Sequence, residues 1–127
     1  MSDLMWLVIA AIVGLVQILA AAQIAQKYRS LDWNVGPRDT PVPIEGTAAR
    51  LERAYRNFLE TFPLFAAVLI AVVLQNKSGN LSHWGALLYV IARIVYVPLY
   101  AFGVKYIRTL VWAVSIVGIV LLIIAAF

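Results

Sequence analysis

The sequence has no cysteine and a single histidine, His83, and charged residues make up only 13% of its 127 positions. Without cysteine the chain can form no disulfide, no protein thiolate nucleophile and no cysteine-ligated metal site. One histidine cannot build a metal site alone. The net charge of +4 is no argument for nucleic acid, because positive charge in an apolar chain mainly sets its membrane orientation. We expect no metal and no nucleic-acid partner.

Apolar residues dominate instead, at 64% of the chain, with a mean hydropathy of +0.91. Soluble domains are nearer half apolar and a quarter charged. At roughly 20 apolar residues per span, the length suits about four transmembrane helices. We expect an all-α, up-down four-helix bundle in the lipid bilayer, as one domain over residues 1–127. Its spans are expected at about 4–26, 47–75, 81–102 and 107–127.

The connection over residues 27–46 contains three prolines and two glycines, which exclude a continuous helix. We expect an ordered loop on the membrane surface, anchored by Trp33. Thr47 is expected to cap the second helix and Gly79 to stop it. The N-terminal residues lack the basic start of a signal peptide, although the small residues of 20–22 keep cleavage open as an alternative.

Basic residues gather at the first and third connections, whereas the second connection has only Lys77. The positive-inside rule then predicts that the first and third connections are cytoplasmic and that both termini lie on the other side. The residues behind this prediction are Lys27, Arg29, Arg38, Arg50, Arg53, Lys105 and Arg108.

Two polar stripes run into the apolar helices. In the second helix, an arc of roughly 80° holds Arg50, Arg53, Asn57 and Glu60. In the third helix, an arc of about 60° holds Tyr89, Arg93, Tyr96 and Tyr100. Charged side chains in a bilayer cost about 2.5–3.5 kcal/mol each on insertion scales, so both stripes should face the protein interior.

The turn between these two helices is short, so residues at equal depth have numbers with a constant sum. This rule sets Glu60 opposite Arg93, Asn57 opposite Tyr96, and Arg53 opposite Tyr100. We expect the deepest level to pair a carboxylate with a guanidinium, in a cleft that opens to the cytoplasm.

The site region contains more arginines than one glutamate can neutralise. Glu60 is accompanied by Arg50, Arg53, Arg56 and Arg108. Such an excess indicates an anionic ligand with carboxylates. The alternative is that the stripes only hold helices together through hydrogen bonds within the membrane. Pro63 and Pro98 lie inside their helices and are expected to serve packing geometry.

These residues resemble the MAPEG family, the membrane-associated proteins of eicosanoid and glutathione metabolism, in a bacterial-type form. The strongest match is Arg50-x-x-Arg53-x-x-x-Asn57-x-x-Glu60-x-x-Pro63-Leu-Phe. A second match is Ala92-Arg93-x-x-Tyr96-x-x-x-Tyr100, and a third is Arg108 at the start of the last helix. The resemblance covers essentially the whole chain.

The resemblance implies a homotrimer in a bacterial inner membrane, with glutathione as co-substrate in sites between subunits. It implies that glutathione is held by Arg53, Asn57, Glu60, Arg93, Tyr96 and Tyr100, with Arg50 beside them. Arg108 matches the arginine thought to stabilise the thiolate and would be the catalytic residue. The gap from Tyr100 to Arg108 does not match every member of the family.

Three functions remain to be compared. The first is a glutathione-dependent transferase or peroxidase-like enzyme acting on lipophilic electrophiles that partition into the bilayer. The second is a non-catalytic member that binds a lipid or a partner protein. The third is a small four-helix drug/proton exporter, which usually needs a carboxylate inside the first span, and residues 4–24 have none there.

Overall fold

The computed structural model describes residues 2–127, and these residues form helices joined by turns and loops, without strands. The helices are α1 (Asp3–Ala25), α2 (Leu31–Val35), α3 (Gly46–Leu74), α4 (Asn80–Ala101) and α5 (Ile107–Ala126). The four longer helices are long and apolar enough to cross a membrane. This confirms the predicted all-α membrane bundle, and each long helix begins and ends within one residue of the expected span.

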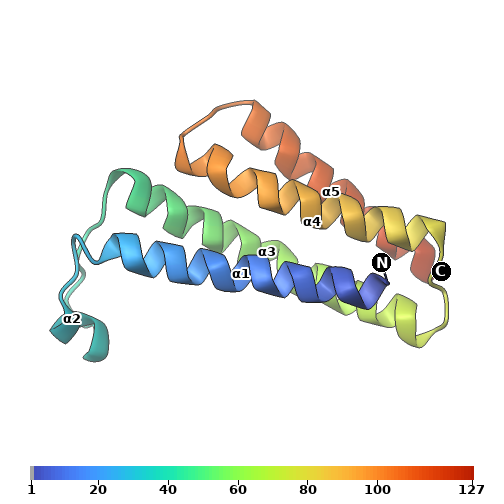
Figure 1. Ribbon diagram of the computed structural model, residues 1–127, viewed down its shortest axis with the longest axis horizontal. Coiled ribbons are helices and arrows are strands. Elements are labelled where there is room, and N and C mark those ends of the chain that lie inside the picture. Colours follow the sequence, from blue (N-terminus) through green and yellow to red (C-terminus); the bar gives the residue numbers. More distant parts are fainter. Residues whose placement is uncertain (1) are drawn as a thin grey trace.

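The four long helices run up and down in two layers, α1 beside α3 and α4 beside α5 (Figure 1). The connection from α1 to α3 and the turn from α4 to α5 lie at one end of the bundle, called here the loop end. The chain termini and the α3–α4 turn lie at the other end, called the termini end. There the Lys77 ammonium donates hydrogen bonds to the carbonyls of Ala126 and Phe127.

A core cluster of buried apolar residues fills the half of the bundle nearer the termini end. Its centre is a stacked pair of rings, Phe65 from α3 and Tyr89 from α4, with centroids 4.0 Å apart. The Tyr89 hydroxyl lies 2.9 Å from the Thr61 hydroxyl, so the buried phenol has a partner. The remaining buried core residues are Trp6, Ala10, Leu69, Ala86, Val90, Ile119 and Leu122.

Helices α4 and α5 touch through their backbones at Gly85 and Gly118. A Cβ added to Gly118 would lie 2.6 Å from the Gly85 carbonyl oxygen, and one added to Gly85 would lie 2.7 Å from the Gly118 carbonyl oxygen. Small residues at such crossings let membrane helices approach closely enough for dense van der Waals packing. The α4–α5 pair is therefore the most tightly fitted contact of the bundle.

Two expected helix caps are wrong. Helix α3 begins at Gly46 after the N-cap Glu45, so Thr47 is not the cap. The helix ends at Leu74 in a Schellman turn closed by Asn76, whose φ is 58°, rather than at Gly79. Asparagine tolerates this left-handed conformation, and Gly79 instead forms the N-cap of α4.

The long connection contains a short helix, α2, which the sequence analysis did not foresee. The Ser30 hydroxyl caps it by accepting a hydrogen bond from the Trp33 backbone N–H at 3.1 Å. The Trp33 indole N–H donates to the Thr40 carbonyl in the same connection. Trp33 thus packs against its own loop while staying partly exposed, and its expected role as an anchor at the membrane surface remains a prediction.

Candidate functional site

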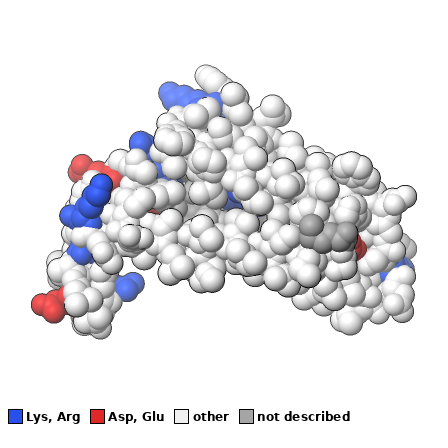
Figure 2. All heavy atoms as spheres, in the orientation of Figure 1, with Lys and Arg blue, Asp and Glu red and all other residues white. Residues whose placement is uncertain are grey.

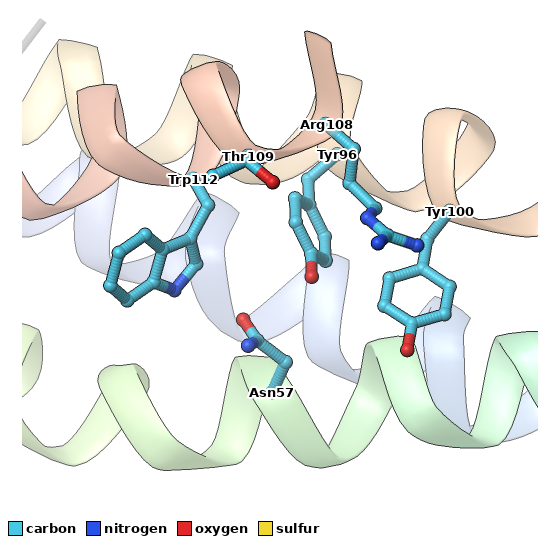
Figure 3. Close-up of a pocket in the computed structure, with 6 residues that line it drawn as sticks. All are labelled: Asn57, Tyr96, Tyr100, Arg108, Thr109 and Trp112. Atoms are coloured by element: carbon cyan, nitrogen blue, oxygen red, sulfur yellow. The ribbon is translucent and has the colours of Figure 1, made fainter. Parts of the chain in front are cut away.

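A cavity of about 270 Å³ lies between α3, α4 and α5 in the half of the bundle nearer the loop end (Figure 3). Three helices contribute its lining, so the fold brings together residues that lie far apart in the sequence. The lining residues are Asn57, Tyr96, Tyr100, Arg108, Thr109 and Trp112. Four of these six are residues that the sequence predicted for the ligand site.

Arg93 contacts Asn57 and Tyr96 of the cavity lining and is almost completely buried, at 1% exposure. Its Nη1 donates a 2.8 Å hydrogen bond to the Asn57 side-chain oxygen. The guanidinium carbon lies 4.3 Å from the Tyr96 ring centroid and 5.8 Å from that of Phe58. Two aromatic rings and an amide therefore surround the cation, whereas its Nε and Nη2 have no protein partner in the described chain.

The expected ion pair between Glu60 and Arg93 is wrong. Both ion pairs found among residues 2–127 involve Glu52, with Arg29 at 3.2 Å and with Arg56 at 2.9 Å. Equal backbone depth does not fix which group a long arginine side chain reaches, and this one reaches Asn57. The choice has a physical reason, because a neutral amide gives one N–H of the guanidinium a partner without the desolvation of a second charge. Glu60 stays exposed on α3.

Tyr100 joins α3 to the start of α5. Its hydroxyl accepts a 3.2 Å hydrogen bond from the Arg53 Nε, which is the pairing expected from equal depth. The Arg108 guanidinium lies over the same ring, 4.5 Å from the centroid. In Figure 3 the Arg108 side chain extends along the cavity toward Tyr100. The Tyr100 side chain thus contacts two arginines, and of these Arg108 lines the cavity.

Arg50 and Tyr89 lie outside the cavity lining. The Arg50 Nε donates to the Ala101 carbonyl at 2.9 Å, which satisfies one of the free carbonyls at the end of α4. Tyr89 belongs to the apolar core. Arg56 is held by Glu52, so part of the arginine excess serves the structure rather than a ligand.

Two residues of the cavity, Thr109 and Trp112, were not foreseen. Trp112 follows Arg108 by four positions, so both lie on one face of α5. That spacing is present in the sequence and was the available signal. An interfacial tryptophan is so common in membrane helices, however, that it does not by itself indicate a cavity.

Replacing Asn57 with alanine should remove the only hydrogen-bond partner that Arg93 has among the described residues. Losing a hydrogen bond to a buried charge costs about 1.5–3 kcal/mol. We expect a matching loss in the free energy of unfolding, measured by denaturant titration in detergent micelles. Thr109→Ala is the control, since Thr109 lines the same cavity without holding a buried charge. Equal stability of the two variants would show that Arg93 finds another partner.

Together these features define a class: a multi-pass membrane protein with an arginine- and tyrosine-rich cavity between its helices. The model of the MAPEG family matches residues 4–127, which is essentially the whole chain. The protein belongs to the MAPEG family. No curated protein matches the chain in the corresponding comparison.

Proposed function

We propose that this protein is a glutathione-dependent membrane enzyme, a transferase or peroxidase-like protein that acts on lipophilic electrophiles from the bilayer. The observation that carries the proposal is the cavity itself, which Arg108 and Tyr100 line together with Asn57 and Tyr96, the two contacts of the buried Arg93. Family membership supports a role linked to glutathione. The basic loop end favours a site that opens to the cytoplasm.

The residues present suit the groups of glutathione. Its two carboxylates need cationic donors, and Arg53 and Arg108 provide them at the mouth of the cavity. The buried Arg93 has two nitrogens, Nε and Nη2, without protein partners in the described structure. The amine of glutathione needs an acceptor, for which the Glu60 carboxylate is available on α3. Asn57, which lies between Arg53 and Glu60 along α3, adds a side-chain amide that can hydrogen-bond the peptide groups of glutathione.

A second copy of the chain would complete this site. Glu60 is exposed although it lies well inside a membrane-spanning helix, and an unpaired carboxylate facing lipid is costly. The cavity of about 270 Å³ is also smaller than the usual 300–1,000 Å³ of ligand pockets. Both points support glutathione sites between the subunits of a homotrimer, where Glu60 would face a neighbour instead of acyl chains.

Glutathione would bring its own thiol as the nucleophile, so the absence of cysteine from the chain is no obstacle. A nearby cation lowers the pKa of a thiol and raises the fraction of reactive thiolate. Arg108 would play this part as the catalytic residue. The thiolate would then attack a substrate that reaches the cavity from the membrane. At an electrophilic carbon it would form a thioether and expel a leaving group as its anion. At a peroxide oxygen it would break the O–O bond, releasing an alcohol and leaving the sulfenic acid of glutathione, which a second glutathione would reduce to the disulfide and water.

Binding and thiolate formation can be tested separately. Purified protein in detergent should bind glutathione and also an analogue that carries a methyl group in place of the thiol, as measured by calorimetry. Only glutathione should increase the ultraviolet absorbance of thiolate. Absence of binding by both peptides would contradict the proposed enzyme.

The alternative is a non-catalytic member that binds a lipid or another protein. An apolar groove of about 240 Å³ favours this candidate. It lies between α1 and α4 and is lined by Ile12, Val13, Val16, Gln17, Ile94, Val97 and Pro98. Co-purified lipid without any glutathione binding would support this alternative.

A further inference from the structure

Helix α2 lies beyond the end of α1, on the side of α1 away from α4 and α5 (Figure 1). It exposes two large apolar side chains, Leu31 at 75% and Val35 at 76%. Residues four apart share one face of a helix, so these side chains form a small apolar face, called here the α2 face. Nothing in the bundle covers it.

The rest of the connection holds this face in place. Two cations pack on the Trp33 ring, with the guanidinium carbons of Arg29 and Arg38 at 4.9 and 5.4 Å from its centroid. The Arg38 Nε also donates to the Asn34 carbonyl at 3.0 Å. Because the aromatic ring is fixed on the inner side, Leu31 and Val35 point outward in a defined direction.

An ion pair and a backbone turn keep α2 close to the end of α1, where the chain leaves the membrane. Arg29 forms a 3.2 Å ion pair with Glu52 on α3. The Tyr28 and Arg29 backbone N–H groups both donate to the Ala25 carbonyl, which makes the chain turn directly after α1. Six residue steps from Ala25 to Leu31 span at most about 20 Å even when fully extended. The α2 face therefore stays within reach of the headgroup layer.

The loop end carries the charge that an anionic membrane surface would attract. Eight basic residues gather there, namely Lys27, Arg29, Arg38, Arg50, Arg53, Arg56, Lys105 and Arg108. The acidic residues facing them are fewer, namely Asp32, Asp39, Glu45 and Glu52. Figure 2 shows most lysine and arginine side chains toward this end. Such a basic surface attracts anionic lipids, and salt weakens this attraction.

We propose that α2 is a membrane-surface anchor that docks onto a leaflet of anionic phospholipid. Leu31 and Val35 enter the boundary of the acyl chains, while the exposed Lys27 and Arg38 are available to the phosphate groups. A cavity of about 430 Å³ between the end of α1 and α2 supports this arrangement. Its lining includes Arg29, Ser30 and Asn34, whose side chains can donate hydrogen bonds, next to the apolar side chain of Leu31.

Spin labelling can test the anchor, because the chain has no cysteine of its own. One nitroxide is attached at Val35→Cys and, as the matched control, one at the exposed Asp39→Cys in the same connection. Both variants are reconstituted into vesicles of phosphatidylcholine alone or with one quarter phosphatidylglycerol. Collision with oxygen, which concentrates in the membrane, is compared with collision with a water-soluble nickel chelate.

The expected result is a several-fold higher ratio of oxygen to nickel accessibility at position 35 than at position 39. This ratio should rise with phosphatidylglycerol and fall when salt is added. Equal nickel accessibility at both positions in both vesicles would overturn the proposal. Strong spin–spin coupling at position 35, already present in detergent, would overturn it in favour of docking against a second copy. Neither outcome depends on glutathione.

Discussion

Replacing Arg108 with alanine is expected to abolish the thiolate absorbance that glutathione produces on binding. Arg108 lines the cavity and lies over the Tyr100 ring with its guanidinium turned into the space. Removing one charge-stabilising donor from an active site typically lowers kcat by about 10²–10³. The measurements are difference absorbance during a glutathione titration and the rate of conjugation with a lipophilic electrophile.

Lys105→Ala is the matched control for charge, because Lys105 is an exposed cation near Arg108 that does not line the cavity. It should keep both the absorbance and the rate. Arg108→Lys should retain part of the thiolate signal, since a cation remains near the sulfur. If Arg108→Ala binds glutathione with its thiolate absorbance unchanged, another group stabilises the sulfur and the catalytic role of Arg108 fails.

Substituting Gly118 with serine should lower the free energy of unfolding more than any other substitution of a single small residue. The new Cβ would lie 2.6 Å from the Gly85 carbonyl oxygen and 2.8 Å from the Tyr89 backbone nitrogen. Backbone atoms cannot rotate aside as a flexible side chain can, so α4 and α5 must separate. Overpacking of a tight core costs about 1–3 kcal/mol, occasionally more, and we expect the upper end of this range.

The same substitution at Gly79 provides the control. Nothing lies within 4 Å of a Cβ added there, and serine is a good N-cap for α4. Denaturant titrations of both variants in the same detergent give the difference in the free energy of unfolding. Equal stability of Gly118→Ser and Gly79→Ser would mean that the α4–α5 contact relaxes without cost.

The sequence predicted the four spans closely because their apolar runs are long and interrupted by clear turns. It also identified Asn57, Tyr96, Tyr100 and Arg108, because polar groups inside apolar helices stand out. Their roles as ligand contacts remain predictions. The pairing of Arg93 could not be foreseen, since a long side chain can reach more than one level of the neighbouring helix.

Other features depended on contacts that no local pattern contains. The capping role given to Thr47 failed because the N-cap is Glu45, two residues earlier, and Gly46, with φ of 59°, is the first residue of α3. Helix α2 is only five residues long, too short for its periodicity to be recognised. The position of Trp33 depends on a carbonyl seven residues away.

The core cluster around Phe65 and Tyr89 lies in the half of the bundle near the termini, whereas in the other half arginines and phenols line or adjoin a cavity between α3, α4 and α5. Regions with few buried apolar contacts open locally at lower free energy than a dense core. The helix ends around the cavity can therefore part briefly while the far ends hold them together. We therefore expect a bulky substrate to enter and leave the cavity sideways through this transient gap, without any unfolding of the protein.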